Sequence, residues 1–136
     1  MKFRKTLARG VALALLAAPL AYAADEVETL PSGVTVQKLN KTSGAQPKAS
    51  DQVKVHYRGT LENGTEFDSS YKRGEPAKFP LSRVIPCWTQ GVQKLRVGEK
   101  ARLVCPPNTA YGAAGIRGVI PPDSTLNFEV ELIAIE

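Results

Sequence analysis

The sequence predicts an α+β domain, in which an antiparallel sheet packs one face against a single short helix. Apolar and polar residues alternate along segments 53–61 and 126–132, which is typical of strands with one buried and one solvated face. Pro86 fixes φ near the helical value, so it suits the first turn of a short helix over residues 87–95. The length indicates one domain, and no internal repeat divides it.

The predicted elements begin with a strand over residues 34–41, followed by a loop over residues 44–50 that contains a proline. The next strand has an apolar residue at every second position from Val53 to Tyr57, with basic residues between them. This alternation predicts that one face of the strand is buried and the other is in water.

A tight hairpin turn is predicted at Asn63-Gly64, because these residue types supply the positive φ angles that such turns require. Phe67 then begins the return strand. Beyond the helix, residues 100–104 alternate again and are predicted to form a strand. Segment 106–122 holds four prolines and three glycines, so we expect an irregular loop, and loops of that length in compact domains are usually functional.

Residues 1–23 have the order of a secretory signal peptide. Basic residues come first, an apolar run follows, and Ala21-Tyr22-Ala23 supplies the small residues for cleavage after Ala23. The alternative is a membrane anchor, but the apolar segment 11–23 is shorter than the roughly 20 residues that span a bilayer. Residues 24–33 are predicted to form a flexible arm. We therefore expect a periplasmic or secreted protein with no membrane anchor after cleavage.

The formal charge of +5 does not indicate a nucleic-acid-binding protein, because most of it comes from the predicted signal peptide. Four of the 18 basic residues lie in residues 1–23, and none of the 13 acidic residues does. The mature chain therefore has 14 basic against 13 acidic side chains, a formal charge of +1. DNA or RNA binding requires a much more basic surface, so no nucleic-acid partner is predicted.

The sequence offers little for covalent or metal catalysis. Its one histidine, His56, falls on the solvated face of its strand, which favours an exposed structural histidine over a catalytic base. Cys87 and Cys105, without a second histidine, are a poor set of metal ligands. The glycines of segment 106–122 have no helix after them, so they do not indicate a phosphate-binding loop. We therefore predict no metal and no cofactor.

A group of aromatic and large aliphatic residues is the remaining candidate for a site. The group is Tyr57, Phe67, Phe79, Val84, Ile85, Trp88, Tyr111, Val119, Ile120 and Phe128. In a small domain most of these are expected to lie in the core, which is the default interpretation of each one alone. Trp88 beside a proline and Tyr111 in the irregular segment fit a core role least well. Asp68, directly after Phe67, is either a turn-forming acid or a placed polar group.

Six motifs, in order along residues 34–136, resemble those of the FKBP-type peptidyl-prolyl cis-trans isomerases. They are Val55-His56-Tyr57-Arg58-Gly59, Gly64-Thr65-Glu66-Phe67-Asp68-Ser69-Ser70, Val84-Ile85-Pro86-Cys87-Trp88, Ala110-Tyr111-Gly112, Ile120-Pro121-Pro122 and Leu126-Asn127-Phe128-Glu129-Val130-Glu131-Leu132. The resemblance implies one isomerase domain, 34–136, whose five- to six-stranded antiparallel sheet wraps around one short helix. It also implies that the substrates are proline-containing or unfolded polypeptide clients.

The resemblance further implies a role for each residue of a proline pocket between sheet and helix. Trp88 is expected to form the floor beneath the prolyl ring, and Asp68 to lie near the twisting amide, hydrogen-bonded to Tyr57. Tyr111 is expected to offer its hydroxyl, and Ile85 its backbone N–H, to substrate carbonyls. The expected walls and edges are Tyr57, Phe67, Phe79, Val84, Ile116, Val119, Ile120 and Phe128.

Two positions depart from the eukaryotic cytosolic members of this family. Ala77 stands where those members have a phenylalanine at the pocket edge, and Ile116 where they have a histidine in the long loop. These changes are similar to the bacterial macrophage-infectivity-potentiator branch. Dimeric members of that branch carry a long helical arm, whereas about ten residues separate Ala23 from the first predicted strand, so we expect a monomer. Tacrolimus-type macrolides are a further ligand class that the resemblance implies.

Cys87 and Cys105 are predicted to form a disulfide in the exported protein, because an oxidising compartment favours pairing of the only two cysteines. In the expected fold, the start of the helix lies near the end of the strand on which it packs. Two buried free thiols are the alternative.

Two hypotheses for the function remain. The first is an isomerase that needs no acid, base or metal, which suits a sequence with few such groups. The second is a chaperone-like module that holds peptides in the same pocket with little turnover. The presence of Trp88, Tyr111 and Asp68 together favours the isomerase.

Overall fold

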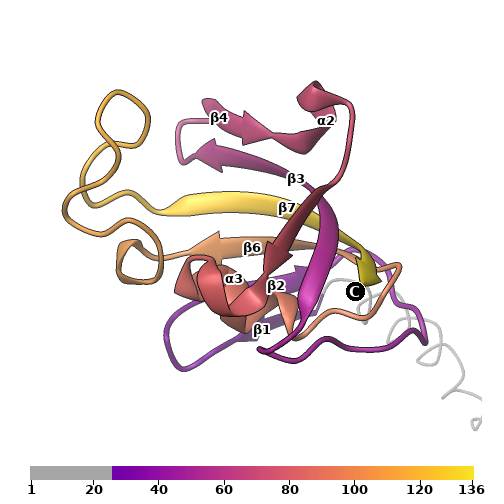
Figure 1. Ribbon diagram of the computed structural model, residues 1–136. Helices are drawn as coiled ribbons and strands as arrows, with labels where there is room; N and C mark the ends of the chain where they lie inside the picture. Colours follow the sequence, from indigo (N-terminus) through magenta and orange to yellow (C-terminus); the bar gives the residue numbers. More distant parts are fainter. Residues whose placement is uncertain (1–25) are drawn as a thin grey trace, which may run out of the picture.

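The computed structural model describes residues 26–136, which form one seven-stranded sheet with two short α-helices (Figure 1). The strands are β1 (Val27–Thr29), β2 (Thr35–Lys38), β3 (Gln52–Leu61), β4 (Glu66–Ser69), β5 (Ala77–Pro80), β6 (Lys100–Cys105) and β7 (Leu126–Ile135). The α-helices are α2 (Ser70–Arg73) and α3 (Pro86–Val92), and the 3-10 turns are η2 (Leu81–Arg83) and η3 (Pro107–Thr109). The predicted α+β class is confirmed.

The predicted signal peptide, residues 1–23, lies outside the described residues. Within the range 26–136, no helix has the length and apolar character that crossing a bilayer demands.

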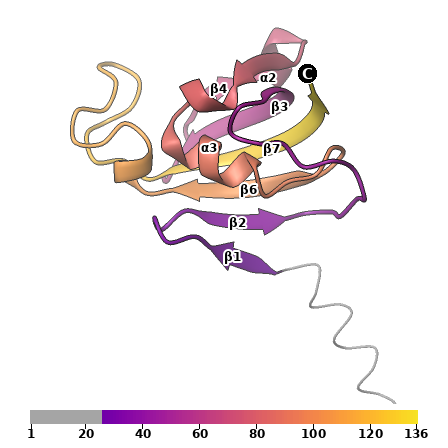
Figure 2. The same ribbon diagram turned by 60° about the horizontal axis from the view of Figure 1, so that its bottom comes forward.

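All strand pairs are antiparallel, and the sheet order is β1-β2-β6-β7-β3-β4. β3 has β7 along one side, and its other side is shared by two strands. β5 pairs with the start of β3 and β4 with its later part, so the chain crosses from one to the other through α2. Helix α3 lies against one face of this sheet (Figures 1 and 2).

The hydrophobic core lies between α3 and the sheet. Alternate residues of β3 and β7 face it, and Val53, Val55 and Val130 are 0% exposed, as their alternation predicted. Gly91 of α3 permits close packing, because a Cβ built there would lie 3.0 Å from both methyl carbons of Leu103 in β6. The helix that carries much of the candidate site is therefore held tightly on the sheet.

Three features of the fold were not predicted. β1 occupies residues 27–29 of the predicted flexible arm, where Glu28 pairs with Val36 of β2. β5 and α2 were not expected either, and the sheet exceeds the predicted five to six strands because β1 and β5 both join it. Helix α3 ends at Val92 rather than at residue 95. All three residues of β1 are exposed, so backbone pairing rather than apolar burial holds it, and no hydrophobic pattern marks it.

The β3–β4 turn contains one left-handed residue rather than two. Gly64 has a φ of 91°, and Asn63 has no positive φ. The N–H of Leu61 donates to the carbonyl of Thr65 at 2.8 Å, and the N–H of Gly64 donates to the carbonyl of Leu61 at 2.9 Å. Asn63 acts through its side chain, whose oxygen accepts the N–H of Thr65 at 2.9 Å. The dipeptide thus marks the turn correctly, although the geometry differs from the expected one.

Candidate functional site

A pocket of about 460 Å³ opens between the start of α3 and the strands β3, β4, β5 and β7. Its lining residues are Tyr57, Phe67, Asp68, Phe79, Arg83, Val84, Ile85, Trp88, Tyr111 and Phe128. Every one of them except Arg83 is a site residue predicted from the sequence. The fold thus brings together side chains from separate strands, a helix and a loop, and their roles in binding stay a prediction.

Trp88 lies at the centre of the aromatic lining and is only 4% exposed. Its ring meets the rings of Tyr57, Phe79 and Phe128 edge to face, at centroid distances of 5.0, 5.4 and 5.4 Å. Such contacts fix the orientation of the indole as well as burying it. The indole N–H has no hydrogen-bond acceptor within residues 26–136. The pocket therefore presents a rigid, apolar surface.

Gly59 of β3 shapes the pocket wall, a role that the sequence analysis missed. A Cβ built there would lie 2.6 Å from Cζ of Phe67 and 2.8 Å from Cε1 of Phe128. These two rings pack nearly perpendicular to each other, with centroids 5.6 Å apart. The missing side chain lets both rings close over the backbone of β3. The strand pattern could not reveal this, because it does not show which strand position the two rings cover.

We expect Gly59→Ala to lower the free energy of unfolding by about 1–3 kcal/mol, because both rings must move to admit the methyl group. The moved rings should also weaken the binding of proline peptides. Urea unfolding measures the first effect, and titration of the fluorescence of Trp88, the only tryptophan, measures the second. Thr60→Ala, one residue along the same strand, is the matched control. Unchanged stability and peptide binding in Gly59→Ala would contradict this account.

Asp68, Tyr57 and Arg73 form a hydrogen-bonded network at the pocket. The hydroxyl of Tyr57 donates to Oδ2 of Asp68 at 2.5 Å, and Nη1 of Arg73 donates to Oδ1 at 2.7 Å. Nη2 of Arg73 also donates to the Tyr57 hydroxyl at 3.0 Å. Both carboxylate oxygens are therefore engaged, and Asp68 is held in one orientation at the edge of the pocket.

The network keeps Asp68 charged and Tyr57 neutral. Burial and the hydrogen bond to Asp68 raise the pKa of Tyr57. Burial alone would raise the pKa of Asp68 as well, but the hydrogen bonds from Tyr57 and Arg73 outweigh it, so this pKa is lowered. Neither group changes its charge near neutral pH, so neither suits general acid–base catalysis there. Within residues 26–136, no group of three acidic, histidine or cysteine side chains is placed to hold a metal ion.

Among the hydrogen-bond donors at the pocket, the hydroxyl of Tyr111 and the backbone N–H of Ile85 have no partner in the part of the chain that the structure describes. Burial and the charge of Asp68 raise the pKa of Tyr111, so its hydroxyl keeps its proton. Ile85 is the N-cap of α3, and its carbonyl accepts the N–H groups of Trp88 and Thr89 at 2.9 and 3.2 Å. The N–H of Ile85 itself makes no hydrogen bond to residues 26–136. Both donors are therefore available to carbonyl groups of a bound peptide.

Ile116, Val119 and Ile120 do not line this pocket, although they were predicted to bind substrate. They lie around a second hollow of about 450 Å³ in the loop between β6 and β7. The N–H of Ile116 donates to the carbonyl of Ile120 at 2.8 Å, and the N–H of Ile120 donates back to Ile116 at 2.8 Å. This pairing folds the loop onto itself, and the predicted contact of the three side chains with substrate stays a prediction.

Two arginines near the pocket were also missed. Arg73 ends α2, and Arg83 ends η2, neither of which the apolar pattern predicts. The only sequence signal for Arg73 was its position five residues after Asp68, which has no structural meaning until α2 is known.

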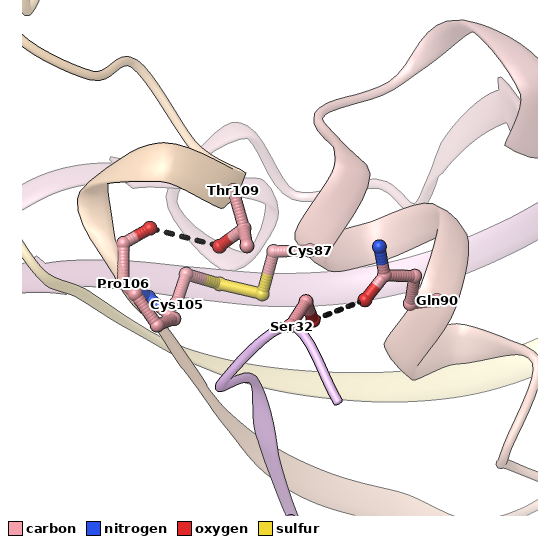
Figure 3. The surroundings of a disulfide bond; sticks show 6 residues. All are labelled: Ser32, Cys87, Gln90, Cys105, Pro106 and Thr109. Carbon is pink, nitrogen blue, oxygen red and sulfur yellow. Dashed lines mark hydrogen bonds between the residues drawn. A yellow bond between two sulfur atoms is a disulfide. The ribbon is translucent and has the colours of Figure 1, made fainter. Parts of the chain in front are cut away.

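A disulfide joins Cys87, near the start of α3, to Cys105, at the end of β6 (Figure 3). Their Cα atoms are 5.6 Å apart, and both side chains are 0% exposed. Next to the bond, the hydroxyl of Thr109 donates to the carbonyl of Pro106 at 2.8 Å (Figure 3). The disulfide therefore ties the helix that carries Trp88 to the strand that leads into the long loop.

Residues 43–133 match the family model described as FKBP-type peptidyl-prolyl cis-trans isomerase. The chain belongs to this family. The matched range contains every lining residue of the pocket, so the pocket is a feature of the FKBP-type domain.

Curated FKBP-type relatives agree with this assignment. The chain is 54% identical over 110 residues to "FKBP-type peptidyl-prolyl cis-trans isomerase FkpA" of Aeromonas hydrophila, and 50% identical over 110 residues to the protein of that name from Escherichia coli K12. These alignments cover 81% of the chain but 41% and 40% of the relatives, so the chain spans about two fifths of their length. "Peptidyl-prolyl cis-trans isomerase Fkbp12" of Drosophila melanogaster is 49% identical over 107 residues, with 76% of the chain and 99% of the relative covered.

Solved FKBP-type structures share the fold. The crystal structure of FkpA from Escherichia coli is 43% identical with a TM-score of 0.79, covering 95% of this chain and 60% of that one. The peptidyl-prolyl cis-trans isomerase from Pseudomonas syringae is 33% identical with a TM-score of 0.77, covering 99% of both chains.

Proposed function

We propose that this protein is a peptidyl-prolyl cis-trans isomerase that accelerates rotation about X-Pro bonds in exported polypeptides. The observation that carries the proposal is the combination of an apolar pocket around Trp88 with two unused donors beside it, on Tyr111 and Ile85. A prolyl ring is apolar and suits the indole surface. The carbonyl groups next to it need hydrogen-bond donors once water has been displaced.

The physical basis of the reaction is the loss of amide resonance. Resonance gives peptide bonds a rotation barrier of roughly 18–20 kcal/mol, and uncatalysed X-Pro isomerisation takes tens to hundreds of seconds. A twisted amide has lost this resonance and is less dipolar than a planar one. Transfer from water to an apolar pocket therefore favours the twisted state, and each 1.36 kcal/mol removed from the barrier speeds the reaction about tenfold.

Hydrogen bonds are proposed to hold the substrate while the bond turns. Tyr111 and the N–H of Ile85 bind flanking carbonyl groups, and Trp88 lies beneath the prolyl ring. Asp68 lies near the twisting amide, in the orientation that Tyr57 and Arg73 impose. No step in this mechanism transfers a proton or forms a covalent bond.

The alternative is a chaperone-like module that binds proline-containing or unfolded chains in the same pocket with little turnover. The oriented Asp68 favours the isomerase, because a module that only holds apolar segments has no need of a fixed charge beside the proline. Tacrolimus-type macrolides are a second ligand class proposed for the pocket.

We further propose that the chain is exported to the periplasm or beyond the cell, with removal of residues 1–23 after Ala23. The order of basic, apolar and small residues supports a leader. The buried disulfide fits an oxidising compartment, where such bonds persist. The exported protein is proposed to act as a monomer on folding clients.

Turnover by the purified protein, measured in a protease-coupled assay on a proline peptide, is the direct test of this function. Tyr111→Phe should lower kcat/KM roughly three- to tenfold, since it removes one neutral hydrogen bond. Asp68→Ala removes a charged acceptor, so its loss should be larger, roughly ten- to a hundredfold. The rate should stay nearly constant from about pH 6 to 8, because no group titrates in the mechanism.

Tyr71→Phe is the matched control, because Tyr71 is 43% exposed and outside the pocket lining. It should keep full activity, and the melting temperatures of Tyr71→Phe and Tyr111→Phe should match that of the unmodified protein. Full activity in folded Tyr111→Phe and Asp68→Ala would reject the residue assignments. Peptide binding without isomerisation by the unmodified protein would favour the chaperone-like module.

A further inference from the structure

Arg83 is a charged residue in the lining of an otherwise mostly apolar pocket. It ends η2, two residues before Ile85, whose N–H makes no hydrogen bond to residues 26–136. Its side chain is exposed, so it lies where a bound chain would leave the pocket for solvent. A prolyl ring on Trp88 therefore brings the residues that flank the proline close to this guanidinium.

The charges at the pocket leave Arg83 without a counter-ion. The other charged lining residue is Asp68, and it already forms an ion pair of 2.7 Å with Arg73. Across residues 26–136, no carboxylate lies within 4.0 Å of the Arg83 guanidinium. The Asp68–Arg73 pair is compensated, so the edge of the pocket carries one free positive charge.

We propose that Arg83 is a specificity-determining residue that favours clients with aspartate or glutamate within two residues of the X-Pro pair. The inference rests on the proposed isomerase function and names its preferred substrate class. A guanidinium presents several N–H donors in one plane, and this geometry matches the two oxygens of a carboxylate. A lysine in the client would instead meet a like charge, which disfavours it at the same position.

This preference should affect binding rather than the chemical step. The flanking carboxylate does not change while the X-Pro bond turns, so its contact with Arg83 is equally strong in the ground state and the transition state. Such uniform binding lowers KM and leaves kcat unchanged. Because Arg83 is exposed, added salt should weaken the preference.

The experiment uses proline peptides that carry Glu, Gln or Lys at each of the two positions before and the two positions after the X-Pro pair. Exchange spectroscopy by NMR gives the isomerisation rates without a coupling protease, and Trp88 fluorescence gives Kd. At one position or more, the unmodified protein should show a KM for Glu roughly two- to fivefold below that for Gln at low salt, with equal kcat. The KM for Lys should be higher than that for Gln.

The ratio of the KM values for Glu and Lys peptides is then measured for each variant and compared with the ratio for the unmodified protein. It should approach one in Arg83→Gln and invert in Arg83→Glu. Arg102→Gln is the matched control, because Arg102 lies in β6 outside the pocket lining and is 54% exposed, and its ratio should equal that of the unmodified protein. Circular dichroism confirms that each variant is folded.

Equal KM values for Glu and Lys peptides at all four positions would overturn the inference. A preference that persists in Arg83→Gln would overturn it as well, since another group would then be its source. Failure of the proposed function looks different, because no peptide would be isomerised at any composition. In that case the Kd values of the Glu and Lys peptides, compared in the same way as the KM values, would still test the role of Arg83 in binding.

Discussion

The Cys87→Ala/Cys105→Ala double variant is expected to lose about 3 kcal/mol of unfolding free energy. The disulfide joins residues 18 positions apart. Closing a loop of that size lowers the conformational entropy of the unfolded chain, which raises its free energy by about this amount. Both cysteines are 0% exposed, so the variant also loses packing contacts between α3 and β6. Equilibrium unfolding in urea, followed by the fluorescence of Trp88, measures the difference.

Reduction separates the covalent bond from the packing of its atoms. The unmodified protein should lose most of the same free energy in the presence of a reductant, whereas the double variant should not respond to it. Mass spectrometry of alkylated protein shows whether the bond has been opened. An unchanged urea midpoint in protein shown to be reduced would contradict the expected stabilisation.

Apolar alternation predicted the parts of the fold that bury side chains on one face. β3 and β7 pair over nearly their whole length, so their pattern of buried and exposed residues is regular and readable. β1 and β5 carry less of this signal, because β1 is fully exposed and β5 has no fully buried residue. Backbone pairing with β2 holds β1, and pairing with β3 together with the partly buried Ala77 and Phe79 holds β5; a single sequence does not show which strand will supply such pairing.

The pocket was predictable to the extent that its residues lie in regular elements or in the motifs of the resemblance. Tyr57, Trp88 and Phe128 lie on strands and a helix whose faces are set by alternation or by Pro86. The three residues Ile116, Val119 and Ile120 lie in the irregular loop between β6 and β7, whose backbone is folded by hydrogen bonds between Ile116 and Ile120. Residue type alone therefore could not place them.

Gly59 and Arg73 show a different limit of sequence reasoning. The importance of Gly59 depends on two rings from β4 and β7 that meet over it. The importance of Arg73 depends on α2, a helix of four residues with no apolar stripe. Each role is a property of several chain segments together, so it becomes visible only after those segments have been placed.

Glu99 carries the second large stability effect, and Glu99→Ala is expected to lower the free energy of unfolding by about 3 kcal/mol. The side chain is 1% exposed, and its oxygens accept the N–H groups of Thr42 and Arg96, both at 2.9 Å. Each N–H group left without an acceptor costs about 1–3 kcal/mol. Lys38 lies 3.0 Å from the carboxylate but is 29% exposed. Water can solvate its ammonium group in the variant, so the lost ion pair adds little to the loss of unfolding free energy.

The same carboxylate should make stability fall in acid. Burial alone would raise the pKa of Glu99, but the hydrogen bonds from Thr42, Arg96 and Lys38 outweigh it, so the pKa is lowered in the folded protein. A lowered pKa gives stability that is present above the unfolded value, about 4.3, and is lost as the pH falls through the folded value. Glu99→Gln cannot titrate, so its deficit in unfolding free energy at pH 7 should narrow below about pH 4. Glu62 is an exposed turn residue, and Glu62→Gln should have the same unfolding free energy as the unmodified protein at pH 7. A deficit of Glu99→Gln that stays constant from pH 7 to 3 would contradict this role of Glu99.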